Sequence, residues 1–489
     1  MSSKNTNSQK GFNRRDFLKT GALSTLFAGP VILNGCGTSE EAANGRDRGN
    51  GKAKNIIFMV SDGMSTGTFT AADHMLKRQY NRQSKWMELY ETKRANRSLM
   101  DMASRDAIVT DSAAAASSWG CGYRVNNGAL NMSPDEEPYE TVLEIFRNSG
   151  KATGLVTTTE VTHATPAGFA SNVPERGMQD EIAKQYFERG YDVILGGGSR
   201  HFDPEEREDG EDLFNQFENN GYQVVRSKDQ LMNYRGSDDK VLGTFYHGHV
   251  PYTTDHLNID QYKETIPSLA EMTEVALERL SGHDEGFIMQ IEGGRVDHAA
   301  HGNDVAGLIY DQIAFDDAIA KAVEFAEGRD DTLVIITTDH GNANPGLNGA
   351  GAGYLDSNNM FDRIQNFRRT NSWILSELDG DSSLSDIKDR IYYANEIDIR
   401  EKEAEYLSKA LNDEYEAIYR IRSRPSAVLS AIQANYTAFN WIGSAHTADY
   451  VELASFGPGS EYLASKGFVK NTELFDLMLD AAGVREYAS

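Results

Sequence analysis

The sequence predicts an α/β fold with a large, mostly parallel central sheet that carries helices on both faces, plus an inserted helical subdomain. Three observations support this prediction. Short apolar runs suited to buried parallel strands alternate with longer stretches of helical periodicity. Most of these runs end in glycine, acidic or imidazole residues, as is typical where parallel strands meet ligand-binding loops. Residues 345–440 lack such a run and have a charged, helical pattern instead.

The first residues are interpreted as an export signal rather than as part of the fold. Residues 1–36 hold Arg14 and Arg15 ahead of a short, broken apolar run, which resembles a twin-arginine signal. The run ends at Cys36 in a segment that resembles a lipoprotein processing box, so we expect either lipidation there or an ordinary cleaved signal. Residues 37–53 are small, polar and Gly-rich, which predicts a flexible tether. The protein is therefore expected to use the twin-arginine export machinery and to be periplasmic or a membrane-anchored lipoprotein.

Five apolar runs are the expected strands of the sheet. They are residues 55–60, 154–159, 192–195, 287–291 and 332–336. The helical stretches between or beside them are residues 139–149, 179–189, 268–280 and 304–327. A sixth run, residues 450–455, is expected to return to the sheet after the insert. We therefore assign residues 54–344 and 441–489 to one α/β domain and residues 345–440 to a helical insert, in which 398–424 is expected to be helical and to end at Pro425.

The charge balance excludes one class of partner. Lys and Arg number 48 and Asp and Glu 74, so the formal net charge is −26. Such a surface argues against a nucleic-acid-binding face, and an anionic substrate would need a local positive site. The two cysteines, Cys36 and Cys121, exclude a disulfide framework.

Two short motifs near strand ends combine carboxylates with imidazoles. Asp297 and His301 are four residues apart, so on a helix they share one face, and such a pair suits zinc. Asp339 and His340 are adjacent at a strand end and can coordinate a metal ion from one side. The alternative for the first motif is a polar helix start with solvated histidines. A lone loop histidine such as His446 indicates little by itself.

Three further features each allow a structural reading beside a functional one. Ser112 begins an Ala-rich stretch, where its hydroxyl is either a nucleophile beside free backbone N–H groups or a plain helix cap. Asp62 follows the first strand and either binds a metal or caps the next helix. The local cluster of His247, His249 and His256 is expected to be a solvated loop rather than a metal trap. No Gly-x-Ser-x-Gly motif exists, so a hydrolase triad is not supported.

Taken in order, the motifs resemble those of the alkaline phosphatase family. They are Asp62-Gly-Met, Thr110-Asp-Ser112-Ala-Ala, His163-Ala-Thr165-Pro-Ala, Glu292-Gly with Asp297-x-x-x-His301, Thr338-Asp339-His340 and His446-Thr447. The resemblance implies a metal-dependent phosphomonoester hydrolase that releases inorganic phosphate through a phosphoserine at Ser112. Two alternatives stay open: a related metal-dependent phosphodiesterase, and a non-catalytic surface lipoprotein that binds phosphate or metal.

The resemblance also implies cofactors, two Zn²⁺ ions and one Mg²⁺ ion, with a set of ligands for each. The first zinc would take Asp297, His301 and His446, the second Asp62, Asp339 and His340, and the magnesium Asp62, Thr165 and Glu292. Arg176 matches the family's phosphate clamp, and its planar guanidinium suits two phosphate oxygens. The implied partners are phosphate monoesters, and because family members are often homodimers the resemblance leaves a homodimer open.

Two histidines depart from the pattern of many bacterial members. His163 stands where those members carry an Asp ligand of the magnesium site, and His298 stands where they carry a Lys near phosphate. Imidazole is a softer ligand than carboxylate, so the third site is expected to hold magnesium less tightly. His298 is expected to touch phosphate through water or to face solvent.

Overall fold

The computed structural model describes residues 52–235, 240–349 and 354–488, all within a compact unit that begins at Asp47. The predicted export signal, Cys36 and the tether up to residue 51 lie outside the described residues. Within the described ranges, no helix has both the length and the apolar character needed to cross a bilayer.

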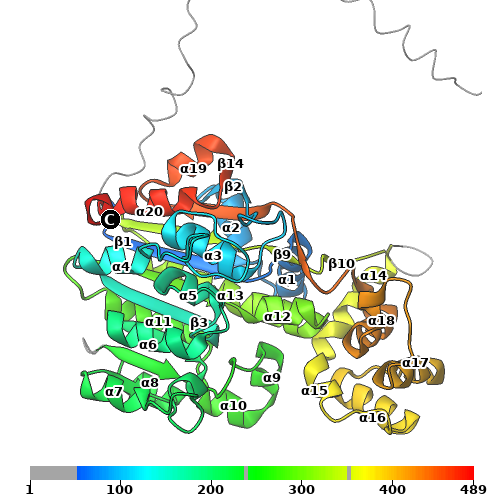
Figure 1. Ribbon diagram of the computed structural model, residues 1–489. Helices are drawn as coiled ribbons and strands as arrows, with labels where there is room; N and C mark the ends of the chain where they lie inside the picture. Colours follow the sequence, from blue (N-terminus) through cyan, green and yellow to red (C-terminus); the bar gives the residue numbers. More distant parts are fainter. Residues whose placement is uncertain (1–51, 236–239, 350–353, 489) are drawn as a thin grey trace, which may run out of the picture. The chain divides into compact units, whose positions relative to one another are not determined.

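A ten-stranded sheet forms the centre of this unit (Figure 1). Its strand order is β14-β2-β13-β8-β1-β7-β3-β4-β6-β5, and among these strands only β13 (Val451–Phe456) runs against its neighbours. The five predicted runs form five adjacent strands: β8 (Thr332–Thr337), β1 (Asn55–Ser61), β7 (Phe287–Gly293), β3 (Ala152–Glu160) and β4 (Val193–Gly197). Every residue of these strands is buried, as expected for a parallel sheet that is covered on both faces.

The remaining strands of the sheet lie toward its two edges and carry weaker sequence signals. They are β2 (Asn96–Asp101), β5 (Gln223–Val225), β6 (Val241–Thr244) and β14 (Phe468–Lys470). Three of them are very short, and β2 alternates buried with exposed residues. The continuous apolar run that identifies a central strand is therefore absent from β2, β5 and β14.

Helices cover both faces of the sheet, which confirms the predicted fold class. Alternate β1 side chains point to opposite faces, with Ile57 and Met59 in one apolar core and Ile56 and Phe58 in the other. The first core includes α1 (Thr66–Gln79), α11 (Leu269–Leu280) and α13 (Val305–Phe325). The second includes α3 (Ser112–Cys121), α4 (Val142–Asn148), α5 (Ala164–Ala170), α6 (Gln179–Arg189) and α20 (Glu473–Ala482).

The stretch predicted as an insert is mostly helical, with two differences from the prediction. Its helices are α14 (Asp356–Asp362), α15 (Asn371–Leu375), α16 (Leu384–Asn395), α17 (Glu401–Leu411) and α18 (Pro425–Thr437). The prediction that residues 398–424 form one helix ended by Pro425 is wrong. Helix α17 ends at Leu411, and Pro425 begins α18, where proline's missing N–H has no helical partner to lose. Short strands β10 (Pro345–Leu347) and β11 (Phe439–Trp441) pair at the ends of the stretch. The division into two domains stays a prediction.

The topology brings distant segments to one edge of the sheet, where the parallel strands end. Strand β1 lies between β7 and β8, with Val60 opposite both Glu292 and Thr337. The residues that follow these strands therefore meet at this edge. Helix α12 (Arg295–His301) starts there directly after β7. Strand β12 (His446–Thr447) pairs with β9 (Gly341–Asn342), which places the late segment beside β8.

Candidate active site

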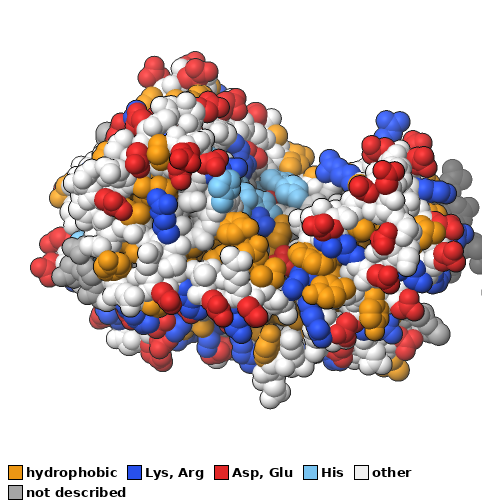
Figure 2. All heavy atoms as spheres, turned by 90° about the horizontal axis from the view of Figure 1, so that it is seen from below, with side chains coloured by type: hydrophobic (Ala, Val, Ile, Leu, Met, Phe, Trp, Pro, Cys, Tyr) orange, Lys and Arg blue, Asp and Glu red, His pale blue; other side chains and the backbone are white. Residues whose placement is uncertain are grey.

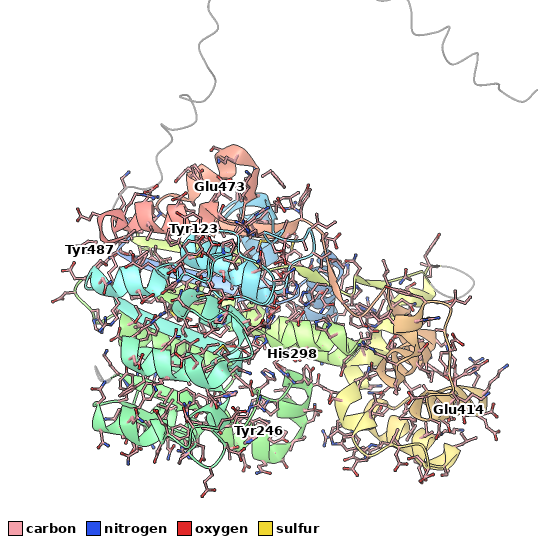
Figure 3. All side chains as sticks on the ribbon, in the orientation of Figure 1. Tyr123, Tyr246, His298, Glu414, Glu473 and Tyr487 are labelled. Atoms are coloured by element: carbon pink, nitrogen blue, oxygen red, sulfur yellow. The ribbon has the colours of Figure 1, made fainter. Side chains whose placement is uncertain are left out.

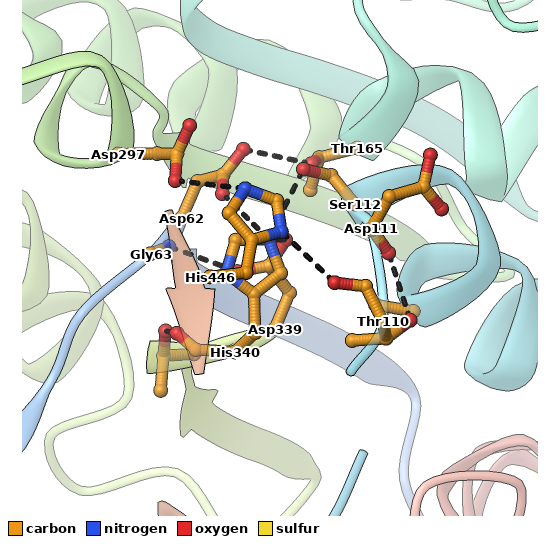
Figure 4. A network of polar contacts seen from close by, with 12 residues as sticks. Asp62, Gly63, Thr110, Asp111, Ser112, Thr165, Asp297, Asp339, His340 and His446 are labelled. Atoms are coloured by element: carbon orange, nitrogen blue, oxygen red, sulfur yellow. Dashed lines mark hydrogen bonds and ion pairs between the residues drawn. The ribbon is translucent and has the colours of Figure 1, made fainter. Parts of the chain in front are cut away.

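Three groups of carboxylate and imidazole side chains converge at this edge. They are Asp297 with His301 and His446, Asp62 with Asp297 and His340, and Asp62 with His163 and Glu292; within each group the ligand atoms lie within 4.8 Å of one another. Figure 4 shows the centre of the site, where Asp62, Asp297 and His340 lie close together. Figure 2 shows the histidines gathered in a hollow of the surface, with acidic side chains spread over the outer surface around it. The structure thus brings together the acidic and imidazole residues that the sequence motifs singled out.

The first group has the spacing of ligands around a small cation. The Nε2 atoms of His301 and His446 lie 3.3 Å and 3.5 Å from the two carboxylate oxygens of Asp297, and 3.0 Å from each other. Ligands of a tetrahedral zinc ion bonded at 2.0–2.1 Å would be about 3.3 Å apart. The three side chains therefore match zinc in both ligand type and separation.

The outer nitrogens of these two histidines decide which atoms face the centre. His301 Nδ1 lies 2.9 Å from the carbonyl oxygen of Ser444, and His446 Nδ1 lies 2.9 Å from that of Thr110. A carbonyl only accepts hydrogen bonds, so each Nδ1 carries the proton and each Nε2 presents a lone pair. Two lone pairs 3.0 Å apart repel each other unless a cation lies between them. The donor set thus fits a metal ion.

The second group, together with the adjacent Asp339, surrounds the Nε2 atom of His340. That atom lies 3.2 Å from Asp339 Oδ2 and 3.5 Å from Asp62 Oδ1. Both oxygens are buried without a hydrogen-bond partner, which is costly unless a cation compensates them. Burial, and then the nearby Asp339 carboxylate, raise the pKa of Asp62 well above its usual value. The second group therefore also has the unmet negative charge that a metal ion would balance.

Gly63 allows the two groups to approach each other. Its φ is +70°, and a Cβ atom at this position would lie 2.5 Å from Asp297 Oδ1. Its backbone N–H donates to Asp339 Oδ1 over 2.9 Å. Only glycine fits here, because the backbone conformation and the close approach both exclude a side chain. Asp62 does not cap the next helix, since the N-cap of α1 is Ser65.

Ser112 lies beside the second group with its hydroxyl free of any capping role. The N-cap of α3 is Asp111, whose Oδ1 accepts the N–H of Ala114. Ser112 is therefore the first helical residue, and its Oγ lies 3.3 Å from His340 Nε2. The guanidinium of Arg176 donates to Asp111 Oδ2 over 3.0 Å and lies beside this helix start. The structural alternative for Ser112, a plain cap, is not what the structure shows.

The third group is richer in oxygen. Glu292 Oε2 accepts hydrogen bonds from Thr157 and Thr159, whereas its Oε1 is buried without a partner. Thr165 Oγ1 lies 3.3 Å from Asp62 Oδ2. Burial raises the pKa of Glu292 to about 7. These hard oxygen donors suit magnesium better than zinc.

His163 of the third group forms a cluster with two further histidines, His249 and His298. The ring centroids of His163, His249 and His298 are 4.5–5.5 Å apart, and Figure 3 shows His298 projecting from α12. Each ring accepts an N–H: His163 Nε2 from Arg176, His249 Nδ1 from the backbone of Glu160, and His298 Nδ1 from Arg295. Burial lowers the pKa of all three imidazoles. They are therefore neutral, and the remaining nitrogen of each ring carries the proton.

The expectation that His247, His249 and His256 form a solvated loop is wrong for two of them. His249 packs against His298, and His256 is buried in α9 (Thr253–Asn258) and contacts the carbonyl of Ile266. His247 is exposed, as expected. The sequence shows these histidines as neighbours, but it does not show which of them turns toward the site.

Asn342 is a site residue that sequence reasoning missed. Its Nδ2 donates to Asp297 Oδ1 over 2.7 Å and to the Asp297 carbonyl over 3.2 Å. This amide fixes the carboxylate that the first two groups share. Its only sequence signal was its place two residues after the Asp339-His340 motif.

Comparisons with known proteins agree with this geometry. The sequence model of the alkaline phosphatase family matches residues 53–484. Alkaline phosphatase 3 of Bacillus subtilis (strain 168) is 32% identical over 468 residues, covering 93% of this chain and 93% of that protein. The crystal structure of Thermus thermophilus alkaline phosphatase has a TM-score of 0.84 at 33% identity, over 93% of this chain and 96% of that one. A cold-active alkaline phosphatase from Shewanella sp. has a TM-score of 0.70 at 25% identity, over 87% and 98%.

Proposed function

The chain belongs to the alkaline phosphatase family and is a metal-dependent phosphomonoesterase, and we propose that Ser112 is its nucleophile and Arg176 its phosphate clamp. The observation that carries the assignment is the Ser112 hydroxyl, which does not cap α3 and lies 3.3 Å from His340 Nε2 at the start of that helix. Arg176 supports it because its guanidinium is anchored by Asp111, the residue before Ser112.

The proposed cofactors are two Zn²⁺ ions and one Mg²⁺ ion. Asp297, His301 and His446 would hold one zinc, Asp62, Asp339 and His340 the other, and Asp62, Thr165 and Glu292 the magnesium. Support comes from the tetrahedral spacing of the first set, the unpartnered buried oxygens of the second and the hydroxyl and carboxylate donors of the third. When bound, such ions supply Lewis-acid stabilisation of the entering and leaving oxygens.

The chain's own residues perform the remaining steps. The planar guanidinium of Arg176 binds two oxygens of the phosphoryl group and aligns the phosphorus with Ser112. Ser112 Oγ gives up its proton to water and forms a bond to phosphorus as the bond to the leaving oxygen breaks, and the departing alkoxide takes up a proton from water to become the alcohol. The free N–H groups at the start of α3 stabilise the negative charge near the serine. Water then displaces the serine oxygen, and inorganic phosphate is released.

Ser112→Ala tests the assignment of the nucleophile. The change removes one hydroxyl and no metal ligand, so the variant should fold, keep its metals and lose turnover by on the order of 10³-fold or more. Labelled phosphate trapped by acid quenching should disappear from the variant. Ser118→Ala is a matched control, because Ser118 lies on the same helix and bonds only to the carbonyl of Ala115. Label on another residue would sink the proposal.

A phosphodiesterase preference is the remaining catalytic alternative. Comparing p-nitrophenyl phosphate with its bis-ester on purified protein distinguishes the two activities. We expect the monoester to be the better substrate. It has three non-ester oxygens, so one would be left for the proposed metal ions when Arg176 binds two, whereas the bis-ester has only two. A higher kcat/KM for the bis-ester would contradict this.

Export is proposed from residues outside the described part of the chain. Arg14→Lys with Arg15→Lys should leave the protein in the cytoplasm, because the arginine pair is what the twin-arginine receptor reads. Cell fractionation with an activity assay checks this. Partition of the mature protein into the detergent phase would support lipidation at Cys36, and partition into the aqueous phase would exclude it.

A further inference from the structure

One buried asparagine joins two segments of the first metal group to the helical insert. Asn303 lies two residues after His301, is fully buried and has a φ of 48°. Its Nδ2 donates to the carbonyl of Ala300 over 3.0 Å and to the carbonyl of Gly443 over 2.8 Å. The first carbonyl belongs to α12, which carries His301, and the second lies three residues before His446. A single side-chain amide thus ties both histidine-bearing segments together.

The orientation of this amide is set by an arginine of the insert. Arg422, in the turn before α18, donates from Nη1 to Asn303 Oδ1 over 2.7 Å. A guanidinium only donates hydrogen bonds, so the amide oxygen must face Arg422 and the amide NH₂ must face the two carbonyls. If the amide were flipped, its NH₂ would meet the arginine and its oxygen would meet two other oxygens.

Further hydrogen bonds connect the backbone of Asn303 to helices of the insert. The backbone carbonyl of Asn303 accepts the side-chain N–H of Asn371, the first residue of α15, over 3.2 Å. Gln433 of α18 in turn donates to Asn371 Oδ1 over 2.7 Å. The segment around Gly443 is anchored on its other side by the carbonyl of Ala343, which follows the Asp339-His340 motif. Asn303 is therefore the anchor on the His301 side.

We propose that Asn303 and Arg422 are positioning residues through which the helical insert holds His301 and His446 at metal-binding separation. The 3.0 Å between the two Nε2 atoms depends on the distance between α12 and the Gly443–His446 segment. The amide of Asn303 spans that distance, and Ser444 completes the link with its carbonyl on His301 Nδ1. This inference rests on the proposed function only in taking the two histidines as zinc ligands.

The test measures zinc release to a chelator from the metal-loaded full-length enzyme. Arg422→Gln and Asn303→Asp should each speed the release of one zinc by about 10- to 100-fold, the usual effect of changing a ligand's supporting partner. The other zinc should stay at its wild-type rate, because Asp62, Asp339 and His340 make no hydrogen bond to Asn303 or Arg422. Asp tolerates the positive φ of residue 303, so the second variant changes the amide with little backbone strain.

Matched variants separate positioning from general stability. Arg422→Lys keeps a donor for Asn303 Oδ1 and should restore most of the slow release. Arg420→Gln removes the same charge from the same turn, where Arg420 is exposed and makes no ion pair with the described residues, and it should behave as wild type. The double variant Arg422→Gln with Asn303→Asp should release zinc no faster than the faster single variant, since the two residues act as one unit. The unfolding temperature of every variant is measured together with its rate of zinc release.

The outcomes are distinguishable. Wild-type release of both zincs from Arg422→Gln and Asn303→Asp would overturn the positioning role while leaving the proposed function intact. If His301→Ala also left release unchanged, the zinc assignment itself would be wrong. Equal acceleration of both zincs, with lowered unfolding temperatures, would show a general loss of structure and would likewise overturn the proposal.

Discussion

Five of the six histidines around the site fall into two groups with opposite hydrogen bonding; the Nδ1 of the sixth, His340, is buried without a partner. His301 and His446 each donate from Nδ1 to a carbonyl, so they turn a lone pair toward the centre. His163, His249 and His298 each accept an N–H at one ring nitrogen, so in each neutral ring the other nitrogen carries the proton. We call these the carbonyl-linked and the donor-linked histidines. For these five rings, the partner of one ring nitrogen decides whether the other presents a lone pair, as a metal ligand must, or a proton.

The comparison changes the expectation for the third metal site. In this arrangement Nε2 of His163 accepts from Arg176, and Nδ1 is buried without a partner and carries the proton. In that tautomer Nδ1 offers no lone pair to a cation, so we predict that the third metal depends on oxygen donors. Asp62, Thr165 and Glu292 then remain the oxygen donors of the third group, and His163 is a hydrogen-bond donor beside them.

The largest effect should come from removing a carbonyl-linked histidine. His301→Ala deletes a proposed zinc ligand, so it should lose one zinc and reduce turnover by more than the about 10- to 100-fold typical of supporting residues. Metal analysis and steady-state kinetics measure both. His298→Ala is the control, because it removes a donor-linked ring of the same size. If the control loses zinc and His301→Ala does not, the comparison is wrong.

A smaller effect is expected from Arg176→Ala, which removes the partner that makes His163 donor-linked. The lost charged hydrogen bonds to phosphate should cost about 2–3 kcal/mol, or about 30- to 150-fold in phosphate affinity. Inhibition by inorganic phosphate measures this. Zinc content should not change, since no proposed zinc ligand contacts the guanidinium. Unchanged phosphate inhibition would show that Arg176 is not the clamp.

The third site provides a test that converts a donor-linked histidine into a carboxylate. His163→Asp with His298→Lys should tighten magnesium by about tenfold or more, because magnesium prefers oxygen ligands and gains little from imidazole. Dialysed, zinc-loaded wild type should gain activity when magnesium is added. Magnesium titration of both proteins decides the matter, and equal affinities would place His163 outside the third site.

The same titration has an expected pH dependence. Burial raises the pKa of Glu292 to about 7, above that of a free glutamate. Below pH 7 its carboxyl group is therefore mostly protonated, and the bound proton competes with the magnesium ion. Magnesium affinity of the wild type should therefore fall as the pH is lowered through 7 and level off above it. A flat profile between pH 6 and pH 8.5 would contradict the role of Glu292.

The smallest effect should come from His249, which supplies one neutral donor. His249→Gln can keep a donor near the same place, whereas His249→Phe keeps the ring without any donor. One neutral hydrogen bond contributes about 0.5–1.5 kcal/mol, so His249→Phe should change kcat/KM by about 2- to 12-fold and His249→Gln by less. Zinc content should match wild type in both. A loss of zinc in His249→Phe would place His249 among the metal ligands.

Much of the fold was predictable because its central strands carry local signals. The runs at β1, β3, β4, β7 and β8 are apolar without interruption, and burial on both faces of a parallel sheet produces that pattern. The outer strands β2, β5 and β14 carry no comparable run, because a strand that is short or partly exposed has few positions that must be apolar. The helix boundaries in the insert were harder to predict, because a proline can either end a helix or occupy the first position of the next one. Pro425 does the second.

The sequence by itself predicted the fold class and the order of the motifs, because strand-end position and i, i+4 spacing are local properties of the chain. The three sets of metal ligands were implied by the resemblance of those motifs to the alkaline phosphatase family. Only the tertiary structure decided how each histidine is used. Thr110 lies 336 residues from His446, whose Nδ1 contacts its carbonyl, and Glu160 lies 89 residues from His249, whose Nδ1 accepts its N–H. The position of a proton on imidazole depends on the partner of the other nitrogen, and that partner is chosen by folding rather than by neighbouring sequence.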